Sequence, residues 1–337
     1  VVRYSDSNGF DWDEFRPRAW RYRDYVVRAF NADKPFARFV EEQLAGDERL
    51  AGAPRDPAEQ DALIATGFLR LGPHDNAAKL FNEQDRSRAE LMADLVETTG
   101  SAFLGLTLSC CRCHDHKFDP LLQADHFRMR AFFEGVAFAD ELPLDLAPEQ
   151  ESIRQHNAGL DARIAEIEKE RDAVLDTVRK RLRTEREAEL TAEERTLLAT
   201  PEAERTAELK GRFDGVRKKV EPSDKEVKAA LQGEAKERHA RLEKEIAGVR
   251  RQRREFTLGL LMTDAPGDPP VTRVLFQGNH QTPRESVGPG FPSVLDPRTA
   301  AIERPPNPAT TGRRSTLARW VTSPSNPWTW RVVVNRV

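Results

Sequence analysis

The chain has 337 residues, of which 38% are hydrophobic and 32% are charged, and its formal net charge is −3. A chain so close to neutrality gives no bulk electrostatic reason to expect a nucleic-acid partner. No apolar run approaches the roughly 18 residues that a membrane-spanning helix needs, so we expect no transmembrane segment. The length allows two domains, or one domain with a large insertion.

The two ends of the sequence indicate a fragment. It begins VVRYSDSNGF, without an initiator methionine or a signal peptide, and it stops inside a helix-like or strand-like pattern. We therefore expect the natural N-terminus to be missing, and the lack of a signal peptide does not decide where the protein resides. Three cysteines, an odd number, exclude a fully paired intrachain disulfide framework.

Residues 1–146 are predicted to form a compact helical domain. Apolar side chains recur at helical spacing over residues 20–30 and again over 36–44, where Gly46 ends the second helix. From Asp85 the pattern predicts a long helix that runs through GSAFLGLTL directly into the cysteines. Asp125 is a candidate cap of a further helix that follows them.

Residues 147–256 are predicted to form a charged antiparallel coiled-coil hairpin inserted between two globular flanks. Aliphatic residues recur there at steps of three and four, and charges fill the other positions. The seam positions are Leu160, Ile164, Ile167, Val174 and Val178 in the first arm, and Leu242, Ile246 and Val249 in the second. The basic run 250–254 is better interpreted as a solvated helix end than as a nucleic-acid contact.

Residues 257–337 return to a globular composition and are predicted to begin a second, mixed domain that is truncated. PPVTRVLFQGNH predicts a strand, PRESVGPGFPSVLDP predicts a loop, and residues 313–337 have the pattern of helix, turn and helix, with 323–327 as the turn. The predicted fold class is therefore mainly α, with a helical cysteine-bearing domain, an inserted hairpin and the start of a mixed domain.

All three cysteines lie in SCCRCHDHKFDP, residues 109–120. Within it, Cys110, Cys113 and His114 form the C-x-x-C-H pattern of c-type haem attachment. Two thiols three residues apart can form thioethers with the two vinyl groups on one edge of a porphyrin, and the next imidazole can then ligate the iron from the proximal side. The motif predicts covalently bound haem c with His114 as an iron ligand.

Three other interpretations of the same residues stay open. Zinc accepts the side chains of Cys110, Cys113, His114 and His116, but four ligands from seven residues are cramped and no second C-x-x-C exists. A redox-active dithiol usually opens a helix after a strand, whereas this pair follows a predicted helix. The last interpretation is buried structural thiols with surface histidines.

If haem is bound, its sixth ligand decides between electron transfer and small-ligand chemistry. The candidates are His126 and Met129, with His74 as a third, although His74 is more simply a surface residue of a Gly-Pro turn and Met129 a core residue. His116 lies only two residues from His114, so it is expected to bond the backbone or a haem propionate.

The charged neighbours of the motif support two further alternatives. Arg112 and Lys117 would neutralise haem propionates, or simply be exposed. Asp115 and Asp119 with His116 would instead form an acid–base or metal cluster in a secreted, metal-dependent hydrolase. A third class of function is structural, with the hairpin as an arm that docks a partner or the cell envelope.

The sequence resembles the planctomycete-type cytochrome c proteins, which are exported and carry paired domains of unknown function. GLTLSCCRCHDHKFDPL is similar to the family pattern GLTxxCARCHDHKxDPI, and AWRYRDYVVRAFNADKPFARFVEEQLAGD is similar to WRYRDWVIxAFNxDxPYDxFVxEQLAGD. LARWVTSPSNPWTWRVVVNRV resembles the start of the second family domain, LAxWLTSPxNPLTARVxVNRVW. The resemblance covers both flanks and leaves out the hairpin.

The resemblance implies a periplasmic or extracellular protein that works with a redox partner or an associated cytochrome domain, and it supplies no reaction. The sequence departs from the family at Cys111, usually Ala, near His126 and Met129, usually Tyr and Leu, and in the loop around Gly278. We therefore expect an exported, c-type-cytochrome-like protein whose role is electron transfer.

Overall fold

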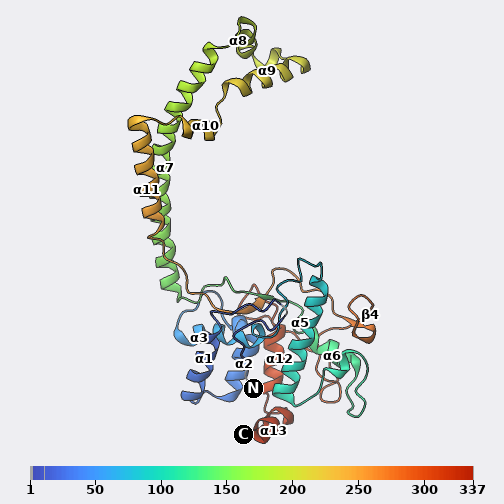
Figure 1. Cartoon of the computed structure of the whole chain (residues 1–337). Coiled ribbons are helices and arrows are strands. Elements are labelled where there is room, and N and C mark those ends of the chain that lie inside the picture. The colour runs from blue at the N-terminus through green and yellow to red at the C-terminus, as the bar shows by residue number, and fades with distance from the viewer. Residues whose placement is uncertain (1–2, 11, 337) are drawn as a thin grey trace. The chain divides into compact units, whose positions relative to one another are not determined.

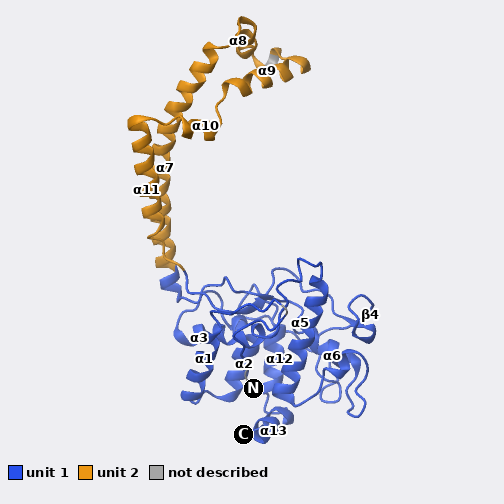
Figure 2. Cartoon of the chain, viewed as in Figure 1, with its two compact units in different colours: residues 1–150, 256–337 blue, residues 151–255 orange. Residues whose placement is uncertain are grey.

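The computed structural model describes residues 3–10 and 12–336, and it is mainly helical, as the sequence predicts. The chain divides into two compact units (Figure 2). The first unit combines residues 1–150 with residues 256–337, and the second consists of residues 151–255. The C-terminal flank therefore shares a unit with the N-terminal flank.

The first unit is built from short helices and two small antiparallel sheets (Figure 1). Its helices are α1 Trp20–Asn31, α2 Phe36–Ala45, α3 Pro57–Ala65, α4 Gly67–Arg70, α5 Gln84–Thr99, α6 Gln123–Arg130, α12 Arg313–Thr322 and α13 Pro327–Arg336. Strand β1 Val136–Phe138 pairs with β2 Met262–Asp264, and β3 Arg273–Leu275 pairs with β4 Pro283–Ser286. Each sheet is too small to form a layer of its own, so the helices supply the core.

One apolar core joins the two flanks. It contains Phe39 and Leu44 of α2 together with Leu317 and Val321 of α12, and these two helices pack against each other. Met262 of β2 is completely buried in the same core. Residues that lie more than 200 positions apart in the sequence therefore depend on each other for burial.

The helix that precedes the cysteines ends earlier than the sequence predicts. Helix α5 stops at Thr99 and continues only as a π-helical turn, Gly100–Leu104. Gly105 then adopts φ +63°, a left-handed conformation that terminates helices and that glycine adopts without steric cost. The prediction of one helix running into the cysteines is wrong, because that glycine stops it.

A buried ionic cluster connects α12 to the rest of the first unit. The guanidinium of Arg314, fully buried, lies 2.6 Å from Asp47, 3.0 Å from Asp264 and 3.6 Å from Glu48. Burial alone would lower the pKa of Arg314, but the three carboxylates raise it well above its ordinary value. Burial raises the pKa of Glu48, against the opposing effect of Arg314.

The second unit is a helical hairpin with additional short helices. It contains most of α7 Ala147–Ala188, then α8 Ala192–Ala199, α9 Ala207–Val220, α10 Asp224–Ala229 and α11 Gly233–Arg250. Leu160, Ile164 and Ile167 of α7 form an apolar seam with Leu242, Ile246 and Val249 of α11. Val178, which the sequence pattern assigns to this seam, instead packs against Val227 and Leu231.

Ion pairs show that α7 and α11 run antiparallel. Arg163 of α7 pairs with Glu245 of α11, and Glu170 of α7 pairs with Arg238 of α11, so positions ascend in one helix as they descend in the other. Pro143 and Leu258, which flank the insertion and belong to the first unit, form an antiparallel bridge. Leu144 donates its backbone N–H to the carbonyl of Thr257 at 2.8 Å.

Within the described ranges 3–10 and 12–336, no helix combines the length and the apolar character needed to cross a membrane.

Candidate functional site

The cysteine segment is a tight surface turn that follows a stretch without regular secondary structure. Cys110–Arg112 form a single 3₁₀ turn, which the N–H of Cys113 closes by donating to the carbonyl of Cys110 at 3.3 Å. Because one turn separates them, Cys110 and Cys113 leave the backbone close together. Both are exposed and neither is in a disulfide.

The third cysteine has a different environment. Cys111 is completely buried in the core of the first unit, where its thiol lies 3.7 Å from the carbonyl oxygen of Leu121. Burial raises the pKa of the Cys111 thiol to about 11, so it stays protonated at neutral pH. The interpretation of buried structural thiols therefore applies to Cys111 and not to the C-x-x-C pair.

The imidazole of His114 is exposed and held in one tautomer. Its Nδ1 lies 2.6 Å from the carbonyl oxygen of Asp115, and since a carbonyl can only accept, Nδ1 must donate the proton. The lone pair of the neutral ring is then on Nε2. A ligating histidine commonly has this arrangement, in which one nitrogen donates to a carbonyl and the other faces the metal.

His116 organises the loop that follows the motif. Its Nδ1 accepts hydrogen bonds from the backbone N–H groups of Phe118, at 3.3 Å, and Asp119, at 2.9 Å. The backbone N–H of His116 donates to the carbonyl of Leu121 at 2.8 Å. The Nδ1 of the His116 side chain is therefore engaged in hydrogen bonds with the backbone, which is one of the two roles that the sequence suggests for His116.

The zinc and hydrolase alternatives gain no support from this geometry. A carboxylate oxygen of Asp115 accepts the backbone N–H of Gln123 at 2.7 Å, and His116 is engaged as described. Across the part of the chain that the structure describes, no group of three or more His, Cys, Asp or Glu side chains is arranged to hold a metal ion.

The candidate sixth ligands lie away from solvent. His126 of α6 is 1% exposed and Met129 is completely buried in the core. The Nδ1 of His126 donates to the carbonyl of Leu108 at 3.0 Å, which fixes the chain two residues before Cys110. His74 is half-buried and packs edge-to-face on Phe138, with the ring centroids 4.6 Å apart.

The buried His126 should make the stability of the protein depend on pH. Burial lowers the pKa of His126 to about 4 from an ordinary value of 6.5. The contribution of neutral His126 to the free energy of unfolding is fully present above pH 6.5. It is lost as the pH falls toward 4, because in that range only the unfolded chain binds the proton. Between pH 7.5 and 5, the free energy of unfolding should fall by about 2 kcal/mol more in the wild type than in His126→Gln.

Urea denaturation at the two pH values measures this difference. Glutamine keeps a donor for the Leu108 carbonyl but does not titrate. The carboxylates of the protein change the free energy of unfolding equally in both chains, so the difference between the chains reports His126 alone. Equal losses in the two chains would show that His126 is not held neutral by burial.

A second segment covers one side of the motif. The side-chain amide of Gln123 donates to the carbonyls of Arg112, at 3.1 Å, and Leu275, at 2.9 Å, and so joins the motif to β3. Gly278 has φ +72°, and a Cβ added there would lie 2.8 Å from the sulfur of Cys113. The sequence comparison singles out this loop for its departures, but only the structure shows that Gly278 contacts Cys113.

Exposed apolar side chains occur on the segments that border the motif. Phe118 is 83% exposed, Leu122 is 46% exposed, and Phe276, which begins the turn that contains Gly278, is 44% exposed. Lys117 is exposed, with its ammonium 5.2 Å from the centre of the Phe118 ring, and Arg112 is half-buried. An apolar surface with basic groups beside it suits a flat apolar ligand that carries acidic substituents.

Residues 1–138, which include the whole cysteine segment, match the model of a family described as PSCyt2, a protein of unknown function (DUF1549). No curated protein and no solved structure matches the chain. The family description assigns no activity, so a function has to be argued from the site itself.

Proposed function

We propose that this protein binds haem c covalently through Cys110 and Cys113, with His114 as the proximal iron ligand, and that it transfers electrons. The observation that carries the proposal is the separation of the three thiols. The two cysteines with haem-attachment spacing are exposed on one turn, whereas Cys111, which does not fit that spacing, is buried in the core.

The state of the imidazole supports the same role. The Nδ1 proton of His114 is held by the Asp115 carbonyl at 2.6 Å, so the ring presents Nε2 as the free donor atom. The hydrogen bond from His126 to Leu108 makes His126 a positioning residue for the start of the motif. When bound, a haem supplies an iron that accepts and releases one electron.

The surface around the motif is the third support for the proposal. Phe118, Leu122 and Phe276 are apolar side chains left in water, and covering them with a porphyrin face would remove apolar area from solvent. Lys117 and Arg112 are the basic groups available to the propionates. Because haem c is attached outside the cytoplasm, the proposal includes a periplasmic or extracellular location and a redox partner there.

The test is a pyridine haemochrome spectrum of protein produced in a strain with cytochrome c maturation, beside the Cys110→Ala/Cys113→Ala variant. We expect a c-type spectrum that survives acid–acetone extraction in the wild type and is lost in the variant. Cys111→Ala is the matched control, and it should keep the spectrum. A colourless wild type from a strain that matures a control cytochrome would refute the proposal.

A further inference from the structure

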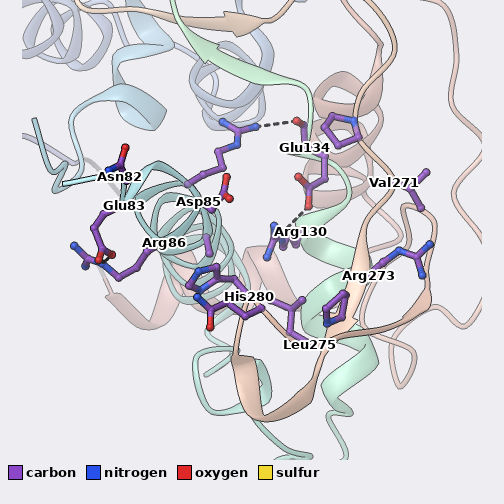
Figure 3. A pocket seen from close by; sticks show the side chains of 15 residues that line it. Asn82, Glu83, Asp85, Arg86, Arg130, Glu134, Val271, Arg273, Leu275 and His280 are labelled. Carbon is purple, nitrogen blue, oxygen red and sulfur yellow. Dashed lines mark hydrogen bonds and ion pairs between the residues drawn. The ribbon is translucent and has the colours of Figure 1, made fainter. Parts of the chain in front are cut away.

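A cavity of about 500 Å³ lies in the first unit (Figure 3), and none of the C-x-x-C-H residues lines it. Helix α5 and the residues just before it form one wall, the end of α6 with Glu134 forms the second, and β3 with the loop after it forms the third. This volume suits a small organic molecule.

Positive charge is in excess in the lining. Four arginines, Arg86, Arg88, Arg130 and Arg273, face three carboxylates, those of Glu83, Asp85 and Glu134. One positive charge remains when His280, which also lines the cavity, is neutral. Carboxylates outside the lining, those of Asp75 and Glu90, also pair with Arg86, so the positive charge that a ligand meets depends on which arginines have no carboxylate partner.

The four arginines differ in how they are neutralised. Arg130 pairs with Glu134 at 2.7 Å, and Arg86 pairs with Glu83, Glu90 and Asp75. Arg88 instead donates to the backbone carbonyls of Val136, at 2.7 Å, and Glu134, at 2.8 Å. Its guanidinium is thus held in place by hydrogen bonds to carbonyls, and no carboxylate of the described residues lies within ion-pair distance of it.

Arg273 is the second arginine of this kind, and it lies on the opposite wall. It is exposed, and one of its terminal nitrogens donates to the carbonyl of Arg284 at 3.0 Å. No carboxylate in the described part of the chain lies within ion-pair distance of it. A planar guanidinium with free N–H groups can bind a carboxylate through two parallel hydrogen bonds.

Apart from the amides of Asn82 and Gln281, the remaining lining is apolar. Val271 is 70% exposed, and Leu275, Pro270, Pro283 and Ala89 also line the cavity. In Figure 3, Val271 and Leu275 come from the same segment as Arg273. A ligand whose charged end binds Arg273 therefore has an apolar surface beside it, which favours an organic acid over an inorganic anion.

We propose that this cavity binds a small organic monocarboxylate, with Arg273 as the principal partner of the carboxylate. The proposal goes beyond electron transfer and does not depend on haem, because neither Cys110, Cys113 nor His114 lines the cavity. The loop after β3 lies between the two sites, since His280 lines the cavity and Gly278 contacts Cys113.

The experiment is a fluorine NMR titration of para-fluorobenzoate and of para-fluorobenzamide, its uncharged counterpart. We expect the benzoate to bind with a Kd of about 1 mM, as its small size allows, and the benzamide to bind at least about tenfold more weakly. In Arg273→Gln the affinity for the benzoate should also fall at least about tenfold, because the charge-assisted hydrogen bonds to the carboxylate are lost.

Arg23→Gln is the matched control variant. Arg23 is an exposed arginine of α1, outside the cavity, and this change should leave binding unaltered. Because Arg273 is also exposed, its replacement should leave the fold intact, which circular dichroism would verify. Equal binding of the benzoate to Arg273→Gln and wild type would overturn the proposal. No preference of the wild type for the benzoate over the benzamide would overturn it as well.

Discussion

Arg314→Met is expected to lower the free energy of unfolding by about 3–5 kcal/mol, the cost of leaving buried carboxylates without their cation. Methionine fills part of the space but supplies no charge or hydrogen bond to Asp47, Asp264 and Glu48. In the wild type, two terminal nitrogens of Arg314 donate to Asp47, at 2.6 and 2.7 Å, so the pairing is bidentate. The measurement is urea denaturation followed by circular dichroism.

The control for this change lies one turn and a half along the same helix. Arg319 pairs with Glu303 at 3.1 Å, but its side chain is 49% exposed. Because exposed pairs contribute little, Arg319→Met should cost less than about 1 kcal/mol. Similar losses in the two variants would mean that Arg314 acts only as a helix residue and not through its charge.

Two of the three thiols should react much faster than the third. In protein made without haem, Cys110 and Cys113 are exposed, whereas Cys111 is completely buried. A maleimide should label two thiols per chain quickly and the third at least about a thousandfold more slowly, because its exposure requires unfolding. The raised pKa of Cys111 slows it further, since the thiolate is the reactive form.

Mass spectrometry of the labelled chain counts and locates the modified residues. Cys111→Ser should still take up two labels quickly, and Cys110→Ser/Cys113→Ser should take up none until denaturant is added. Three equally fast thiols in the native protein would contradict the burial of Cys111 and would remove the main support for haem attachment.

The sequence predicted those parts of the fold that repeat a local pattern. The seam from Leu160 to Ile167 repeats at helical steps, and the helix, turn and helix around residues 323–327 have clear boundaries. Local pattern failed at Gly105, where a single left-handed glycine ends the helix although the apolar pattern continues past it. The prediction of Asp125 as a cap is confirmed, since its carboxylate accepts the backbone N–H of Leu122 at the start of α6, but the pattern could not show that the same carboxylate also accepts from Ser293.

Long-range relations in the site could not be predicted in this way. Cys111 and Cys113 are the same residue type two positions apart, and only the tertiary core decides which one is buried. Arg314 looks like one of many arginines, since its three carboxylate partners lie elsewhere in the sequence. The contact between Gly278 and Cys113 also depends on packing between distant segments.

The bridge between Pro143 and Leu258 has a consequence for the folding of the first unit. A flexible insertion would destabilise the first unit through the entropy of loop closure. This free-energy cost grows with the logarithm of the insertion's length, by about 0.6 kcal/mol for each doubling. Here α7 and α11 pair along their own seam and bring both ends of the insertion together. The insertion therefore connects Leu144 to Thr257 as a short turn would. Lengthening or shortening the α7–α11 hairpin should then leave the loop-closure entropy of the first unit unchanged.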